Sequence, residues 1–295
     1  MYYYDFRMVD ILIRVQSPFE IPQMFELVHF QVPYCPEREP DVLYQIRLLP
    51  EDWTVRGEVL FKQPQSAIYR AGEEYHRYYY WSVGSADRFV LLVYPAEGND
   101  RRVLYLRRQD LDQLLPQFRL SAFFSMEHLL LWHHAFQLHA SVVQWQGQGI
   151  LFSAASGTGK STQAELWRKY EDAQVINGDR GIIRLTGGQY RVYGSPYAGT
   201  SGIYTDLSAP VLAVVILSQA VENSVRRLSA VEAFHSIYRE ATVPAWDTAF
   251  VDEFSGQLTD LITDIPVLHL ACRPDEEAVS VLKTALLEII NDRPG

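Results

Sequence analysis

Cysteine is nearly absent from the sequence: the 295 residues contain only Cys35 and Cys272. Two cysteines exclude a disulfide framework and a cysteine-based zinc site, and this usage is typical of a reducing compartment. The first residues also lack the positively charged segment and the long apolar stretch of a secretory signal peptide. We therefore expect a cytoplasmic protein.

Positive charge is also scarce. The chain carries 26 Lys and Arg against 36 Asp and Glu, a formal net charge of −10, and its sequence pI is about 5.3. A chain of this sign repels the phosphate backbone of nucleic acids and the surface of anionic lipids. We expect no nucleic-acid partner and no membrane partner, although a single anion-binding site is compatible with this balance.

No apolar run is long enough to span a membrane. The longest mostly apolar stretch, residues 120–136, contains Glu127, His133 and His134 and is shorter than the roughly 20 residues that a membrane helix needs. Adjacent histidines point to different faces of a helix, so these two cannot share one metal ion. We expect this stretch to form a buried helix.

Residues 10–108 alternate short runs rich in Val, Ile and Tyr with breaks of Pro, Gly, Asp and Glu. The period of two within the runs predicts an antiparallel sheet. The predicted strands cover residues 10–15, 25–32, 41–49, 55–61, 75–83, 88–94 and 102–108. Helical patterns follow, and this change predicts a β-rich recognition domain over residues 1–118 and a second domain over residues 119–295.

The second domain is expected to combine strands and helices. Two β-rich runs flank residues 146–149, whose glycines allow a tight hairpin. The other predicted strands cover residues 173–178, 181–185, 190–194, 211–218 and 266–272, and the predicted helices cover 160–170, 229–241, 247–262 and 275–290. The expected fold is α+β or α/β: an N-terminal antiparallel β-rich domain, then a core with a mixed sheet and flanking helices.

The sequence A-A-S-G-T-G-K-S, residues 154–161, lies between an apolar strand pattern and an amphipathic helix pattern. It follows the phosphate-loop (Walker A) pattern G-x-x-x-x-G-K-[ST], except that Ala154 replaces the first glycine. Gly157 and Gly159 allow consecutive backbone N–H groups to face phosphate oxygens. The start of the following helix adds the positive end of its dipole.

Lys160 is predicted to reach the outer phosphates of ATP or GTP, and the Ser161 hydroxyl to complete the coordination shell of a magnesium ion. The alternative is a Gly/Ser turn that binds nothing. The predicted nucleotide-binding residues are Ser156, Gly157, Thr158, Gly159, Lys160, Ser161 and Thr162.

The surroundings of this loop resemble a known family. The stretches LHASVVQWQGQGILFSAASGTGKSTQAELW and AQVINGDRGIIRL, within residues 138–217, resemble the HPr kinase/phosphorylase group. The nucleotide-binding core of that group is similar to that of phosphoenolpyruvate carboxykinase. His139, Lys160 and Asp179 follow the order and spacing of the family's histidine, loop lysine and acidic pair.

The resemblance implies an ATP-dependent and magnesium-dependent phosphotransferase with a P-loop kinase core. Asp179 would bind magnesium, directly or through water, or accept the proton of an acceptor hydroxyl. His139 would orient or stabilise the transferring phosphoryl group. The resemblance thus assigns catalytic roles to Asp179, His139 and Lys160, and metal binding to Ser161 and Asp179.

Two departures from the family concern acidic residues. Gly178 stands where the family has the first acid of the pair, so Asp179 does both jobs or a second carboxylate comes from elsewhere. Tyr197 and Gly199 stand where the later loop of the family, residues 193–206 here, has an acidic residue and an arginine. Chemistry on a protein substrate like that of the family is therefore an open question.

The same later loop contains further candidates. Gly199, Ser201 and Gly202 would provide backbone N–H groups for the acceptor, and Ser195 or Thr200 a hydroxyl contact. The alternative is a plain surface turn.

Three more features have a functional and a structural interpretation. Arg180 and Arg273 would face a phosphate or a carboxylate, or form surface ion pairs. The aromatic run at residues 75–81 would stack bases, but we favour the filling of a sheet face.

The function that these observations favour is an ATP-dependent kinase that transfers the γ-phosphate to a hydroxyl. The acceptor is a Ser or Thr of a peptide or protein, or a small hydroxylated molecule, and the N-terminal domain is expected to recognise it. The alternative is a nucleotide-binding interaction module with little or no phosphoryl transfer. The sequence does not decide the acceptor, the choice between ATP and GTP, or the oligomeric state.

Overall fold

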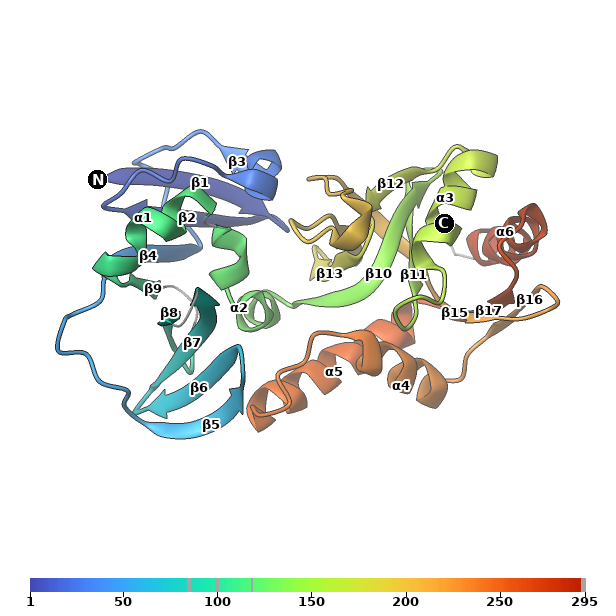
Figure 1. Ribbon diagram of the computed structural model, residues 1–295. Helices are drawn as coiled ribbons and strands as arrows, with labels where there is room; N and C mark the ends of the chain where they lie inside the picture. The colour runs from blue at the N-terminus through green and yellow to red at the C-terminus, as the bar shows by residue number, and fades with distance from the viewer. Residues whose placement is uncertain (84–85, 99–100, 118, 293–295) are drawn as a thin grey trace. The chain divides into compact units, whose positions relative to one another are not determined.

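The computed structural model describes residues 1–83, 86–98, 101–117 and 119–292. The described chain divides into two compact units, Met1–Trp132 and His133–Gly295 (Figure 1). Within these residues no helix is both long enough and apolar enough to cross a membrane.

The first unit is built on one mostly antiparallel sheet. In the described residues it has nine strands in the order β3-β1-β2-β4-β9-β8-β7-β6-β5, and only the pairs β2–β4 and β4–β9 are parallel. The predicted β-rich fold is confirmed. The strands are β1 (Tyr2–Met8), β2 (Ile11–Ser17), β3 (Gln31–Val32), β4 (Val42–Leu48), β5 (Glu58–Gln63), β6 (Ser66–Ala71), β7 (Glu74–Val83), β8 (Ala86–Pro95) and β9 (Arg101–Leu106).

The predicted strand at residues 25–32 is wrong over most of its length. Phe25–Phe30 forms a 3₁₀ helix, η1, and only Gln31–Val32 pairs as a strand. Leu27 and Phe30 are buried at a spacing of three, which is one turn of a 3₁₀ helix. The pattern also missed β1 and β6.

The segment before Trp132 packs on the first sheet. It contains η2 (Arg108–Asp110), α1 (Leu111–Leu114), η3 (Leu115–Gln117), η4 (Leu120–Phe123) and α2 (Met126–Trp132). The buried guanidinium of Arg102 donates to the carbonyls of Phe124 and Ser125, both at 3.0 Å. The first compact unit includes this segment, whereas the sequence pattern placed its part from residue 119 onward in the second domain. The predicted boundary residue, 118, lies outside the described residues.

The second unit contains a mixed sheet with flanking helices, as predicted. Eight strands of its described part form the sheet, in the order β11-β10-β13-β14-β15-β17-β16, with β12 paired to β10 and β11 also paired to β15. The strands are β10 (Ala135–Trp145), β11 (Gln148–Ser153), β12 (Gln174–Asn177), β13 (Arg180–Thr186), β14 (Gln189–Tyr193), β15 (Ser208–Gln219), β16 (Ser224–Arg227) and β17 (Val267–Cys272).

The helices of this unit form two groups. They are α3 (Lys160–Glu171), η5 (Gly199–Ser201), α4 (Ala230–Glu240), α5 (Thr248–Asp264) and α6 (Glu276–Asn291). The core cluster of the sheet includes buried residues of α3 and α6. α4 packs on α5 and on β10 (Figure 1). At the hairpin between β10 and β11, Gln146 and Gly147 both have positive φ, as a tight two-residue turn requires.

Trp167 anchors α3 on the sheet. It is fully buried, and its ring lies 5.2 Å from that of Trp145 and 6.2 Å from that of Phe152, measured between centroids. Its indole Nε1 has no hydrogen-bond partner in the described part of the chain, so its contribution to stability is that of an apolar ring.

We expect Trp167→Ala to lower the free energy of unfolding by about 3–5 kcal/mol, because it leaves a cavity beneath α3. Trp167→Phe should lower the free energy of unfolding clearly less, since its ring still fills part of this space and the lost indole N–H has no partner in the described residues. Urea-induced unfolding followed by circular dichroism measures both values. Equal effects of the two replacements would contradict this packing role.

Candidate functional site

The candidate site lies at one edge of the second sheet. β11 and β12 both run antiparallel to β10, so their carboxyl ends point to the same edge. Loop 154–159 follows β11, and Asp179 follows β12. On β10, Ala140 pairs with the last residue of β11 on one side and with Arg180 on the other. This pairing places the neighbouring His139 between the loop and Asp179.

The two glycines of loop 154–159, Gly157 and Gly159, have backbone conformations that other residues rarely adopt. The φ of Gly157 is +81° and that of Gly159 is +123°. A Cβ atom built at either position would meet nothing within 4 Å. These glycines are therefore needed for the shape of the loop, and the space beside them is open to a ligand.

α3 begins without a side-chain cap. Gly159 is its N-cap residue, and within the described residues this helix start has no side-chain cap hydrogen bond. In contrast, α4, α5 and α6 are capped by Ser229, Asp247 and Asp275. Among the residues that the structure describes, the N–H of Lys160 has no acceptor. The first turn of α3 thus has N–H donors available for an anion, which its dipole also favours.

The ammonium group of Lys160 is held inside the loop. The side chain is only 7% exposed, and Nζ donates to the carbonyl of Ala154 at 3.0 Å. Burial lowers the pKa of Lys160, whereas the nearby carboxylates of Asp179 and Glu240 oppose this shift. A cation so placed gains strongly from a neighbouring polyanion.

Asp179 sits in a turn that Asn177 organises. The Oδ1 of the fully buried Asn177 accepts from the backbone N–H of Asp179 at 2.9 Å and of Arg180 at 2.7 Å. Asn177 Nδ2 donates to the carbonyl of Ser195 at 3.0 Å, and the Ser195 hydroxyl donates to the carbonyl of Arg180 at 2.6 Å. Ser195 is fully buried, so it supports the turn and does not provide the hydroxyl contact that we expected for the acceptor.

His139 lies between two carboxylates. Its Nε2 is 3.2 Å from Asp179 Oδ1, and its Nδ1 is 3.3 Å from Glu240 Oε2. Each ring nitrogen of His139 therefore has a carboxylate oxygen within reach. A shift in the pairing of β10 at His139 and Ala140 marks a β-bulge, which turns this side chain toward the site.

Glu240 contacts His139 on the side away from Asp179, and the sequence analysis did not identify it. It is the last residue of α4, and its side chain is 9% exposed. Ala241 bridges to Leu138 on β10, and the N–H of Thr242 donates to the carbonyl of Gln137 at 3.0 Å. These backbone contacts bring the end of α4 to His139, about a hundred residues earlier in the chain, and no local pattern signals them.

The glycine at position 178 has a steric reason. A Cβ there would lie 1.9 Å from the hydroxyl oxygen of Ser201. At Gly199, a Cβ would lie 2.6 Å from the Asp179 carboxyl carbon, and φ is +55°. The loop after β14 therefore packs directly on the turn of Asp179 and leaves no room for an acidic side chain at position 178.

The two candidate arginines differ. Arg180 Nε is 3.6 Å from Asp179 Oδ2, and its NH1 donates to the Thr242 hydroxyl at 3.2 Å, so it belongs to the site. Arg273 forms exposed ion pairs with Asp275 and Glu277, as its structural interpretation predicted.

The remaining predicted positions surround the loop. Ser156, Ser161 and Thr162 are exposed on loop 154–159 and the first turn of α3. Within the described residues, no group of three or more His, Cys, Asp or Glu has the arrangement of a metal site. A magnesium ion held mainly by phosphate, water and one or two protein oxygens does not require such a group.

Comparisons with known proteins gave one family model and a distant likeness to a solved structure. Residues 119–260 match the family model described as "SynChlorMet cassette protein ScmC". A solved structure, the Hpr(Ser) kinase/phosphatase from Coxiella burnetii, matches with 11% sequence identity and a TM-score of 0.33, over 52% of this chain and 93% of that one. No curated protein matches the sequence.

Proposed function

We propose that the protein is an ATP-dependent kinase that phosphorylates a hydroxyl group. The observation that carries this proposal is the buried ammonium of Lys160 at an uncapped helix start, in the electrostatic range of Asp179 and Glu240. A polyphosphate site beside a carboxylate is the arrangement that phosphoryl transfer to a hydroxyl requires.

The residues of loop 154–159 and α3 fit a nucleotide polyphosphate. Available N–H donors, open space beside the glycines and one enclosed cation all favour a multiply charged anion. Lys160 would neutralise the outer phosphates. Ser161 and Asp179 offer the hard oxygen ligands that magnesium prefers. Bound magnesium supplies neutralisation of the charge that develops on the phosphate oxygens.

In the proposed step, Asp179 is the base. The acceptor oxygen forms a bond to the γ-phosphorus, while the bond from that phosphorus to the β–γ bridging oxygen breaks and leaves its electron pair on ADP. The hydroxyl proton moves to the carboxylate of Asp179. His139 contacts this carboxylate through Nε2, and Glu240 contacts His139 through Nδ1, so both residues would position Asp179.

Titration calorimetry with ATP and magnesium, together with a coupled assay for ADP release, tests the proposal. Binding and turnover with a phosphorylated product among peptides or hydroxylated metabolites would support it. No ATP binding would contradict it.

One observation favours the alternative, a nucleotide-binding module without phosphoryl transfer. Only Asp179 provides a carboxylate in its turn, and that carboxylate already contacts His139 and Arg180. Tight ATP binding without any phosphorylated product would select this alternative.

For the kinase, we expect Glu240→Gln to lower kcat on the order of 10-fold to 100-fold and to leave the KM for ATP nearly unchanged. The replacement keeps the volume but removes the charge that holds His139, while loop 154–159 is untouched. Steady-state kinetics with varied ATP separates the two parameters.

Glu253→Gln, an exposed replacement on α5, is the matched control and should have no effect on kcat. An increase in KM with an unchanged kcat in the Glu240 variant would exclude this positioning role.

A further inference from the structure

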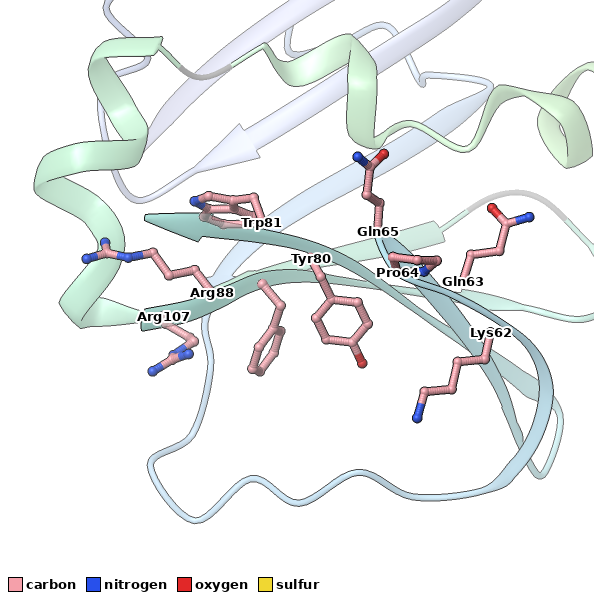
Figure 2. A pocket seen from close by; sticks show the side chains of 9 residues that line it. Lys62, Gln63, Pro64, Gln65, Tyr80, Trp81, Arg88 and Arg107 are labelled. Atoms are coloured by element: carbon pink, nitrogen blue, oxygen red, sulfur yellow. The ribbon is translucent and has the colours of Figure 1, made fainter. Parts of the chain in front are cut away.

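The first unit contains a groove that the proposed function does not use. It has a volume of about 950 Å³ and lies where β7, β8 and the hairpin of β5 and β6 meet (Figure 2). The lining residues are Lys62, Gln63, Pro64, Gln65, Tyr80, Trp81, Arg88, Phe89 and Arg107.

Aromatic rings form the apolar part of the groove. Tyr80 and Phe89 face each other across β7 and β8, with ring centroids 6.3 Å apart. Tyr80 also stacks on the buried Tyr78, at 6.0 Å and 8° between the ring planes. The aromatic run at residues 75–81 therefore divides: its first part fills the sheet face, as we favoured, and Tyr80 and Trp81 line the groove.

The polar part of the groove is cationic. Arg88 and Arg107 share one buried carboxylate, Asp110, at 3.2 Å and 3.5 Å, and Arg107 also lies over the Phe89 ring at 5.3 Å. Lys62 is exposed and has no ion-pair or hydrogen-bond partner among the described residues. Three of the lining side chains are thus cationic, and two of them, Arg88 and Arg107, share a single carboxylate.

We propose that this groove binds an acidic peptide segment that carries an aromatic or large apolar side chain. Arg and Lys groups beside an aromatic surface pair with carboxylates, and the rings accept the apolar side chain. A single-stranded oligonucleotide would offer phosphates to the same cations and bases to the same rings, and its binding is an outcome that the experiment below distinguishes.

The position of the groove favours an extended peptide over a small anion. β5 is the last strand of the sheet, so one of its edges has no neighbouring strand in the described residues, and most of its side chains are exposed. Lys62 and Gln63 of this strand line the groove. The lining continues from these residues to Tyr80 of β7, Phe89 of β8 and Arg107 after β9, and a volume of about 950 Å³ has room for several residues of an extended segment. The inference does not depend on the proposed function.

Fluorescence anisotropy of the full chain with a labelled peptide of alternating Glu and Phe tests this inference. We expect saturable binding that weakens as sodium chloride is raised. Lys62→Glu should weaken binding about 10-fold, because an attraction becomes a repulsion. Arg7→Glu makes the same charge change at an exposed position on β1 and should stay within about twofold of the wild type.

Two further probes decide between ligand classes. A peptide with Lys in place of Glu should not bind, and labelled oligothymidylate should bind more weakly than the acidic peptide. Absence of binding by the acidic peptide, equal binding by Lys62→Glu, or tighter binding of oligothymidylate would each overturn the proposal. Thermal unfolding of Lys62→Glu verifies that the variant is folded.

Discussion

Replacement of Lys160 by alanine is expected to lower the rate of ATP turnover by about 10³-fold or more, a loss of roughly 4 kcal/mol of transition-state stabilisation. The ammonium of Lys160 lies beside the proposed phosphate site, so it needs no rearrangement when charge develops during the proposed transfer. Single-turnover assays with excess protein measure this step directly.

One further variant separates the charge of Lys160 from its packing, and a second variant is a control. Lys160→Met keeps most of the buried stem without the ammonium and should be as inactive as Lys160→Ala. Lys169→Ala removes an exposed lysine from the same helix and should retain full activity. Substantial turnover by Lys160→Met would contradict the role of the ammonium.

Replacement of Asp179 by asparagine is expected to lower kcat by about 10³-fold or more, because the residue is both the proposed base and a proposed magnesium ligand. The backbone turn should persist, since Asn177 binds the N–H groups of residues 179 and 180 rather than the carboxylate. Rates measured over a range of magnesium concentrations test both roles.

The control for this variant is Asp172→Asn. Asp172 is exposed at the end of α3, and its left-handed backbone conformation is one that asparagine accepts readily. We expect normal activity in this control. Normal kcat in Asp179→Asn would require another base and would remove the main support for the proposed step.

Local patterns predicted most of the second unit. The helix at residues 160–170 and the hairpin at 146–149 are confirmed because apolar spacing and turn glycines act over a few residues. The mixed pairing of the first sheet escaped prediction, since it depends on partners far along the chain. The 3₁₀ helix at 25–30 escaped prediction because its apolar residues were assigned to a strand pattern.

The candidate site divides in the same way. The loop motif and the spacing to Asp179 are visible in the sequence, because a strand, a loop and a helix follow one another there. Glu240 is not, because a bridge between Ala241 and Leu138 brings it to His139. The absence of an acid at position 178 becomes intelligible only beside Ser201.

The sequence by itself determined which segment is the candidate for anion binding in an acidic chain, since the glycines, the lysine and the hydroxyl that such a site needs lie within residues 157–161. The tertiary structure decided which side chains join them: His139 between Asp179 and Glu240, and Lys62 beside Arg88 and Arg107 in the first unit. The physical reason is that sheet pairing and packing bring together charges that are separated by many residues, and a local pattern carries no record of that proximity.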